Sequence, residues 1–121
     1  ELTQNLDFDI NSDGVMDSND APFFDYDTDG ENNGWLPIGD NTTPFTAQFN
    51  GNGFEIRNLF INRPSADDAT NGKNIGLCGV VSAGTLKNIG LGGAVMTITG
   101  ETSVGSLVGR LIDGSKLSSS Y

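Results

Sequence analysis

The sequence predicts an all-β fold in which short strands stack in parallel around a narrow core. Three observations lead to this prediction. Glycine and other turn residues are frequent, apolar residues recur about every thirty residues, and no stretch keeps the 3.6-residue periodicity of an amphipathic helix. The chain has 121 residues, 17 of them glycine. This length is about one domain, and the glycines indicate many turns between short strands.

Acidic residues are concentrated at the N-terminal end of the chain. The formal net charge is −10, and residues 1–40 hold eleven acidic residues and no Lys or Arg. Nucleic acid and anionic lipid repel a surface of this sign, and no apolar run is long enough to span a bilayer, so neither nucleic-acid binding nor membrane insertion is expected. Like charges at this density stay ordered only if a cation neutralises them. We therefore expect an acidic calcium-binding cap or linker over residues 1–36. A repeat region, truncated at its C-terminus, is expected over residues 37–121.

The first predicted calcium loop is "DINSDGVMDSND", residues 9–20. A twelve-residue calcium loop supplies oxygen ligands from positions 1, 3, 5, 7, 9 and 12, the seventh through its backbone carbonyl. It also requires glycine at position 6 for a sharp turn, and Gly14 fills that position. The predicted ligands are Asp9, Asn11, Asp13, Val15, Asp17 and Asp20.

The second predicted loop is "DYDTDGENNGWL", residues 25–36, with Gly30 at position 6. Its twelfth residue, Leu36, cannot coordinate, so this loop needs a carboxylate from elsewhere, such as Asp20 or Asp40. One or two Ca²⁺ ions are therefore expected. The predicted ligands of the second loop are Asp25, Asp27, Asp29, the carbonyl of Glu31, and Asn33.

The pattern D-x-N-x-D-G followed by D-x-D-x-D-G resembles the calcium loops of dockerin modules and of thrombospondin type 3 repeats. The sixteen-residue offset between the loops fits the thrombospondin type better. A dockerin needs a full exit helix after the first loop, and "APFFDYD" offers at most two helical turns. The aromatic residues Phe23, Phe24 and Tyr26 between the loops are expected to anchor the ion-bound segment onto the neighbouring core.

Apolar residues repeat at an interval near thirty in the rest of the chain. One repeat has too few apolar residues to enclose a core, but repeats laid in register pair their strands in parallel and bring equivalent side chains into columns. Asn58 and Asn88 match in the same way, which predicts one amide stacked on the other. A β-sandwich, the alternative architecture, predicts no fixed interval. The predicted columns are Ile56–Leu86–Leu117, Leu77–Leu107, Val81–Leu111 and Phe45–Ile75.

Three motifs follow one another from Trp35 onward: W-x-P-I-G, F-x-G-x-G-x-x-I-x-N-L and G-x-L-V-G. In this order they resemble the GLUG-motif repeat regions of large bacterial surface and secreted proteins, over residues 34–121. The resemblance implies a right-handed parallel β-helix, that is, a short β-solenoid with rungs of about thirty residues. It also implies an extracellular, adhesin-like setting at the bacterial cell surface and names no shared reaction.

We do not expect an enzyme. The chain has no histidine to activate Cys78 as a nucleophile, and the charged residues of the repeat region are scattered as on a solvated surface. The expected function is a structural or adhesive, calcium-stabilised module of an extracellular bacterial surface protein that self-associates through its ends. Two alternatives stay open. A carbohydrate-binding module would expose Trp35, Tyr26 or Tyr121 on a flat face for a glycan ligand. A fragment of a polysaccharide-active enzyme would hold a carboxylate pair in a groove.

Overall fold

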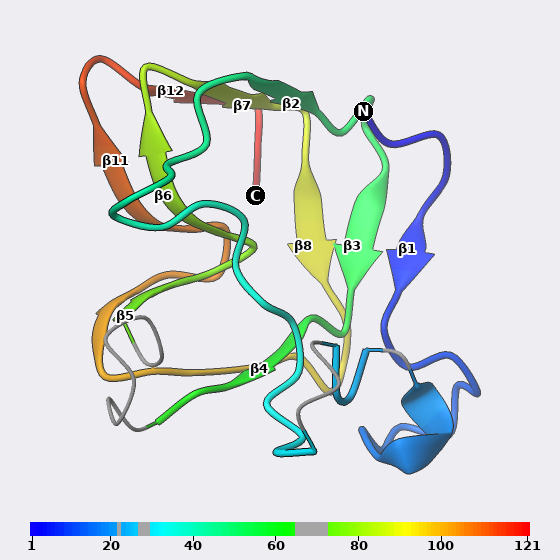
Figure 1. Ribbon diagram of the computed structural model, residues 1–121. Coiled ribbons are helices and arrows are strands. Elements are labelled where there is room, and N and C mark those ends of the chain that lie inside the picture. Colours follow the sequence, from blue (N-terminus) through cyan, green and yellow to red (C-terminus); the bar gives the residue numbers. More distant parts are fainter. Residues whose placement is uncertain (22, 27–29, 65–72) are drawn as a thin grey trace.

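The computed structural model describes residues 1–21, 23–26, 30–64 and 73–121 (Figure 1). These residues form an all-β fold of short strands with one 3₁₀ helix, η1 (Ser18–Asp20). The strands, two to five residues long, are β1 (Leu6–Asp7), β2 (Gln48–Asn50), β3 (Glu55–Arg57), β4 (Phe60–Asn62), β5 (Lys73–Ile75), β6 (Cys78–Ser82), β7 (Thr85–Lys87), β8 (Gly90–Gly92), β9 (Thr97–Thr99), β10 (Thr102–Val104), β11 (Val108–Ile112) and β12 (Lys116–Ser118).

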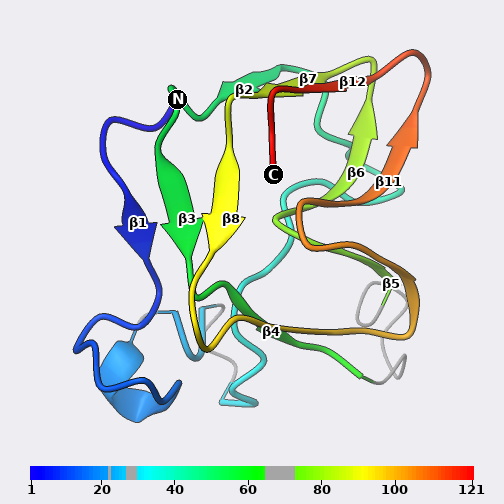
Figure 2. The ribbon, with the colours of Figure 1, turned by 180° about the vertical axis from the view of Figure 1, so that it is seen from behind.

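Three consecutive segments carry most of the strands. The first segment (residues 48–62) holds β2 to β4, the middle segment (73–99) holds β5 to β9, and the last segment (102–118) holds β10 to β12. Strands of neighbouring segments pair in parallel, so that β7 lies between β2 and β12. In the same way β6 pairs with β11, and β3 lies between β1 and β8, as Figures 1 and 2 show from opposite sides. The middle segment is therefore covered from two directions.

The predicted right-handed parallel β-helix is wrong. The described strands belong to five separate sheets of two or three strands, and no sheet closes or continues as a solenoid. The physical reason is that bends interrupt every strand after at most five residues. Residues with positive φ, such as Asn58, Ala83 and Asn88, occupy these bends. The all-β class and the parallel pairing of distant segments are confirmed.

The strand register confirms some of the predicted columns and corrects others. Ile56 pairs with Leu91 and Leu6, not with Leu86, and Phe45 forms a bridge with Val81, not with Ile75. The interval between paired residues is thirty for β6 and β11 but longer for β2 and β3 with their partners, so no fixed period exists. The confirmed columns are Leu86–Leu117 and Val81–Leu111.

The core lies between the segments and is built from strand residues and bends of the first and middle segments, together with Phe8 from the N-terminal part of the chain. Leu77 and Cys78 are both buried although they are adjacent, so the chain does not alternate strictly at this point, beside Gly79. The buried hydrophobic cluster contains Phe8, Ile56, Leu59, Ile61, Ile75, Leu77, Cys78, Val81, Leu86 and Ile89.

The N-terminal segment (residues 2–8) covers the outer edge of the first segment. The N–H of Leu2 donates to the carbonyl of Asn50, and the N–H of Phe8 donates to the carbonyl of Arg57, each at 3.0 Å. Between these contacts β1 pairs with β3. Phe8 at the end of this segment is completely buried. The predicted calcium loop begins at the next residue, so the core fixes where the loop starts.

Candidate calcium-binding loops

The first loop is closed by a contact between its first and sixth positions. The N–H of Gly14 donates to Oδ2 of Asp9 at 3.0 Å. Gly14 has φ +80°, a left-handed conformation that glycine adopts without strain. The sequence spacing predicted this tight turn. The carboxylate of Asp9 is thereby fixed at the base of the loop.

A second contact closes the end of the first loop. Asp20 is completely buried, and its two oxygens accept hydrogen bonds from the N–H groups of Ile10 (2.8 Å) and Asp17 (3.0 Å). Asp17 in turn accepts from the N–H of Asn19 at 2.7 Å, and Asp17 and Asp20 form a reciprocal capping box on η1. Positions 9 and 12 of the loop are therefore ordered by backbone N–H groups.

The middle of the first loop is exposed and bonded within itself. The side-chain oxygen of Asn11 accepts from the N–H of Asp13 at 3.1 Å, and the Asn11 amide donates to Asp13 at 2.8 Å. Asp13 also accepts from the N–H of Val15 at 2.8 Å. Val15, predicted to contribute its carbonyl, has an exposed side chain. All six predicted ligands of this loop thus lie on one ordered stretch.

One carboxylate oxygen in the first loop lacks a hydrogen-bond partner within residues 1–21, 23–26, 30–64 and 73–121. Asp9 is only 5% exposed, and its Oδ1 is buried with no hydrogen-bond donor among the described residues. A buried anionic oxygen without a donor or a cation carries a large desolvation cost. The carboxylates of the loop do not converge on one point. In the described part of the chain, no group of three or more Asp, Glu, Cys or His side chains is close enough to hold an ion.

The second loop repeats the first contact. The N–H of Gly30 donates to Oδ2 of Asp25 at 3.1 Å, and Oδ1 of Asp25 is buried without a donor among the described residues. Asp27 and Asp29 lie outside the described residues. Glu31 is exposed. The carbonyl of Asn33 accepts from the N–H of Asn62 at 2.9 Å, which ties the end of the loop to β4.

The carboxylates proposed to complete the second loop are engaged elsewhere. Asp20 accepts from Ile10 and Asp17 in the first loop. Asp40 accepts from the N–H groups of Thr42 (2.7 Å) and Thr43 (2.6 Å), and these two bonds, that of Thr43 first, lower the pKa of Asp40 below its usual range. Each acid therefore orders its own turn.

Aromatic residues anchor both loops on the core, as predicted for Phe23 and Phe24. Phe8 stacks on Phe23 with ring centroids 4.2 Å apart and meets Trp35 edge-on at 5.7 Å. Phe24 stacks on Phe60 of β4 at 5.5 Å. The indole N–H of Trp35 donates to the carbonyl of Leu77 at 3.0 Å. These contacts join the acidic segment to the first and middle segments.

Sequence reasoning missed Asp7 and predicted the wrong partner for Asn58. The Asn58 amide donates to Oδ1 of Asp7 at 2.8 Å, so Asn58 does not stack on Asn88. The amide of Asn88 donates to Asn50 instead, at 3.0 Å. The signal available in the sequence was an acid placed two residues before the first loop. Its partner, fifty-one residues away, could be found only from the fold.

Comparisons with known proteins leave the family open. No family model matches the sequence. No solved structure gives a significant match. A protein of Evansella cellulosilytica named "Putative Gly-rich membrane protein" is 44% identical over 79 residues, which are 64% of this chain and 8% of that protein. The chain thus spans a small part of its relative. Among the described residues, no helix is long and apolar enough to cross a membrane.

Proposed function

We propose that this chain is a structural, calcium-stabilised module of a cell-envelope protein, and that the first loop binds the ion. The observation that carries the proposal is Asp9, whose carboxylate is almost completely buried and has one oxygen without a donor in the part of the chain that the structure describes. At Asp25 of the second loop, Oδ1 is likewise buried without a donor among the described residues, although Asp25 as a whole is only partly buried. One unsatisfied acid at the first position of each loop favours a cation, because Ca²⁺ takes hard oxygen ligands at that position.

The residues fit the chemistry of calcium. Bound Ca²⁺ would neutralise the local negative charge and coordinate oxygen atoms. The first loop would supply the side chains of Asp9, Asn11, Asp13, Asp17 and Asp20 and the carbonyl of Val15. The second loop would supply Asp25, Asp27, Asp29, Asn33 and the carbonyl of Glu31 for a second ion.

Calcium at the first loop would stabilise the covered edge of the fold. Asp9 follows Phe8 directly, and Phe8 is a fully buried member of the core. An ion that fixes Asp9 therefore opposes the release of the N-terminal segment from β3. Such a role is structural, and we propose no enzymatic activity.

The location and family belong to the same proposal. The name of the Evansella relative supports a cell-envelope location. We propose the extracellular face and an adhesive setting because lower-affinity loops of this type fill at the millimolar calcium found outside cells. Membership of the GLUG-motif repeats rests on the three motifs that begin at Trp35.

Calcium titration tests the proposal. Isothermal titration should give a saturable heat, and at a hundredfold excess of free ion over Kd the free energy of unfolding should rise by about 2.7 kcal/mol relative to chelator.

Asp9→Asn should weaken binding, yet in chelator it should be at least as stable as the wild type because it removes a buried charge. Asp113→Asn is the matched control, since Asp113 is an exposed acid bonded to Ser82. No binding by the wild-type chain would refute the proposal.

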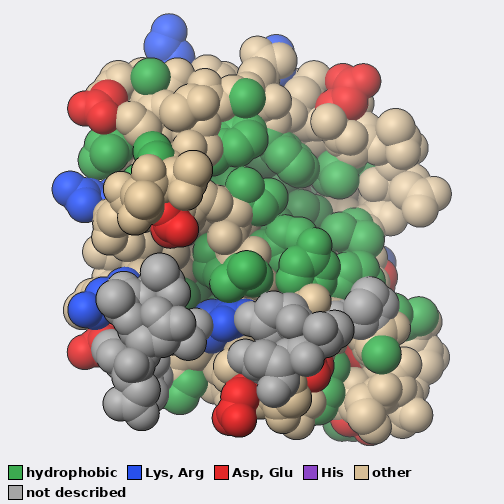
Figure 3. Space-filling view, viewed as in Figure 1, with side chains coloured by type: hydrophobic (Ala, Val, Ile, Leu, Met, Phe, Trp, Pro, Cys, Tyr) green, Lys and Arg blue, Asp and Glu red, His purple; other side chains and the backbone are tan. Residues whose placement is uncertain are grey.

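Self-association is a second proposal, supported by the last segment. Val104, Leu111 and Leu117 there are each more than 40% exposed. Figure 3 shows that hydrophobic side chains also gather across the middle of the face seen in Figure 1. Light scattering in calcium should show concentration-dependent dimers or larger species, and Leu111→Ser with Leu117→Ser should abolish them. A monomer at every concentration would remove the proposal.

The glycan alternative gains no specific support. The rings of Tyr26 and Trp35 have centroids 4.5 Å apart and are tilted by 48°, and the indole N–H of Trp35 donates to the carbonyl of Leu77. Trp35 is therefore part of the packing between loop and core. Tyr121 donates its hydroxyl to Glu55 at 3.0 Å. Tyr26 and Tyr121 nevertheless remain 41% and 73% exposed.

A further inference from the structure

Asn58 occupies a buried bend between β3 and β4 and contacts two separate parts of the chain. It is 8% exposed and has φ +55°. Its side-chain amide donates to Asp7 in β1 at 2.8 Å, and its side-chain oxygen accepts from the N–H of Val95 at 3.1 Å. Its own N–H donates to the carbonyl of Gly92 at 2.8 Å. Asn58 thus joins the N-terminal segment to the chain between β8 and β9.

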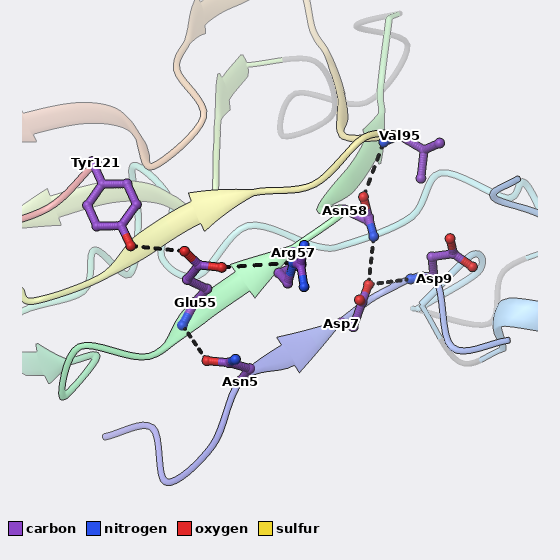
Figure 4. Close-up of polar contacts among 8 residues, drawn as sticks. All are labelled: Asn5, Asp7, Asp9, Glu55, Arg57, Asn58, Val95 and Tyr121. Atoms are coloured by element: carbon purple, nitrogen blue, oxygen red, sulfur yellow. Dashed lines mark hydrogen bonds and ion pairs between the residues drawn. The ribbon is translucent and has the colours of Figure 1, made fainter. Parts of the chain in front are cut away.

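Asp7 passes this connection to the first calcium loop. The same Oδ1 that accepts from Asn58 also accepts from the N–H of Asp9 at 3.1 Å. Figure 4 shows the continuous path Val95–Asn58–Asp7–Asp9. Asp7 lies outside the twelve-residue loop, so its carboxylate is free to act as an acceptor for these two donors. The backbone of the first predicted ligand is therefore held through Asn58.

The chain opposite Asn58 leaves space for the Asn58 side chain because a glycine lies there. Gly93 has φ +112°, and a β carbon on it would lie 2.1 Å from Oδ1 of Asn58. Any other residue at position 93 would displace the Asn58 amide. The position of the Asn58 side chain therefore requires glycine at position 93.

Asn88 provides an internal comparison. It sits in the next segment in the same left-handed conformation, φ +54°, and donates its amide to Asn50 at 3.0 Å. Its partner is a neutral amide, whereas the partner of Asn58 is a carboxylate that bonds to the loop. Both asparagines stabilise a bend, but only Asn58 is connected to Asp9.

We propose that Asn58 is a positioning residue for calcium, which sets the backbone of Asp9 through Asp7 and couples ion binding to the packing of residues 92–95. This inference rests on the proposed calcium function. Without Asn58, Asp7 loses its only side-chain amide donor among the described residues and lies two positions from another acid, so the entrance to the loop becomes less ordered. Partners behind a metal ligand contribute about 10- to 100-fold to metal affinity.

The test is calcium affinity by isothermal titration for Asn58→Ala and Asn88→Ala beside the wild type. We expect Asn58→Ala to raise Kd about 10- to 100-fold and Asn88→Ala to leave Kd unchanged, although both lower the thermal midpoint. Equal Kd values for the wild type and a folded Asn58→Ala would overturn the inference. Absence of binding by the wild type would instead refute the proposed function.

A second variant keeps the test decisive if Asn58→Ala does not fold. Asp7→Ala removes the shared acceptor and leaves the bend intact, and it should raise Kd by a similar factor. Amide exchange gives an independent reading: calcium should increase the protection of the Val95 N–H in the wild type and in Asn88→Ala, but not in Asp7→Ala. A wild-type Kd in Asp7→Ala, together with a calcium-dependent rise in Val95 N–H protection as large as in the wild type, would exclude the positioning role.

Discussion

The two outer edges of the strand stack differ in how they end. At the first segment, residues 2–8 pair with β3, and Phe8 is completely buried. At the last segment, Leu117 is 46% exposed, although its partner Leu86 in the middle segment is 0% exposed. Both are leucines at the same register. Burial at these positions therefore depends on whether a further segment lies outside, and not on residue type.

The edges also differ in charge. Residues 1–40 hold eleven acids and no base, whereas residues 101–121 hold two acids and two bases. Repulsion within an acidic cover favours the binding of a cation, while a neutral edge carries no electrostatic barrier to an apolar partner. Calcium and self-association are therefore expected at opposite edges.

Truncation of the covering aromatic residue should have the largest effect. Phe8→Ala removes a ring packed against Phe23 and Trp35 and should cost about 3–5 kcal/mol in the free energy of unfolding, measured by denaturant titration. A loss below about 1 kcal/mol would show that the N-terminal segment does not cover the core in solution.

Alanine substitutions of the paired residues Leu86 and Leu117 compare the stability contributed by the middle segment with that contributed by the exposed last segment. Leu86→Ala should cost about 2–5 kcal/mol because it leaves a cavity in the core. Leu117→Ala, with nearly half of its side chain in solvent, should change stability by roughly 0.5 kcal/mol. Equal losses would mean that the last segment is covered by another molecule, which light scattering would detect.

Thiol labelling compares a second pair of positions. Cys78 is buried, and burial raises its pKa from 9.0 to about 12. Its partner Val108 in the last segment is partly exposed. The double variant Cys78→Val, Val108→Cys has its thiol at position 108 in place of position 78. At pH 8 this thiol should be labelled more than about tenfold faster than Cys78 of the wild type, because the thiolate fraction falls tenfold for each unit by which the pKa rises. Similar rates would contradict the difference in burial.

The same thiol gives a pH dependence. The folded pKa lies above the unfolded value, so the contribution of Cys78 to stability is complete below pH 9.0 and is lost as the pH rises toward about 12. Cys78→Val should remove that part of the decline, as seen in denaturation curves taken between these pH values. An unchanged decline would assign it to other groups.

The smallest effect is expected at Tyr121. Its hydrogen bond to Glu55, and then the charge of Glu55, raise the pKa of Tyr121 above its ordinary value of 10.0. Its contribution to stability is therefore present below pH 10 and is lost as the pH rises through the raised pKa. Absorbance titration of Tyr26→Phe, which retains only Tyr121, should show this midpoint, and Glu55→Ala should lower it. No change on Glu55→Ala would mean that the contact is absent in solution.

The strand pairing was predictable in type but not in register. Glycine content and recurring apolar residues indicate short parallel strands, and Leu86–Leu117 was found from spacing alone. The pairing of Ile56 with Leu91 was missed because Leu86 and Leu91 are equally apolar and only one bend apart. A slip between them changes no residue type, so a sequence comparison cannot detect it.

The candidate site was predictable where its contacts are local. The spacing of Asp9 and Gly14 predicts their bond because both lie in one loop. The path through Asp7 and Asn58 depends on β1 pairing with β3, fifty residues away, and no spacing rule reports such a contact. The β-helix prediction failed for a related reason, since it assumed equal repeats and the bends differ in length.

One close approach has a consequence for how this fold can vary. A β carbon at Gly79 would lie 2.4 Å from the carbonyl oxygen of Gly39, and one at Gly39 would lie 2.6 Å from the carbonyl oxygen of Val80. Neither glycine can be enlarged, because each added β carbon would collide with a backbone atom. Sequence change at this contact is therefore confined to glycine, and the chain must diversify at its bends and outer edges instead.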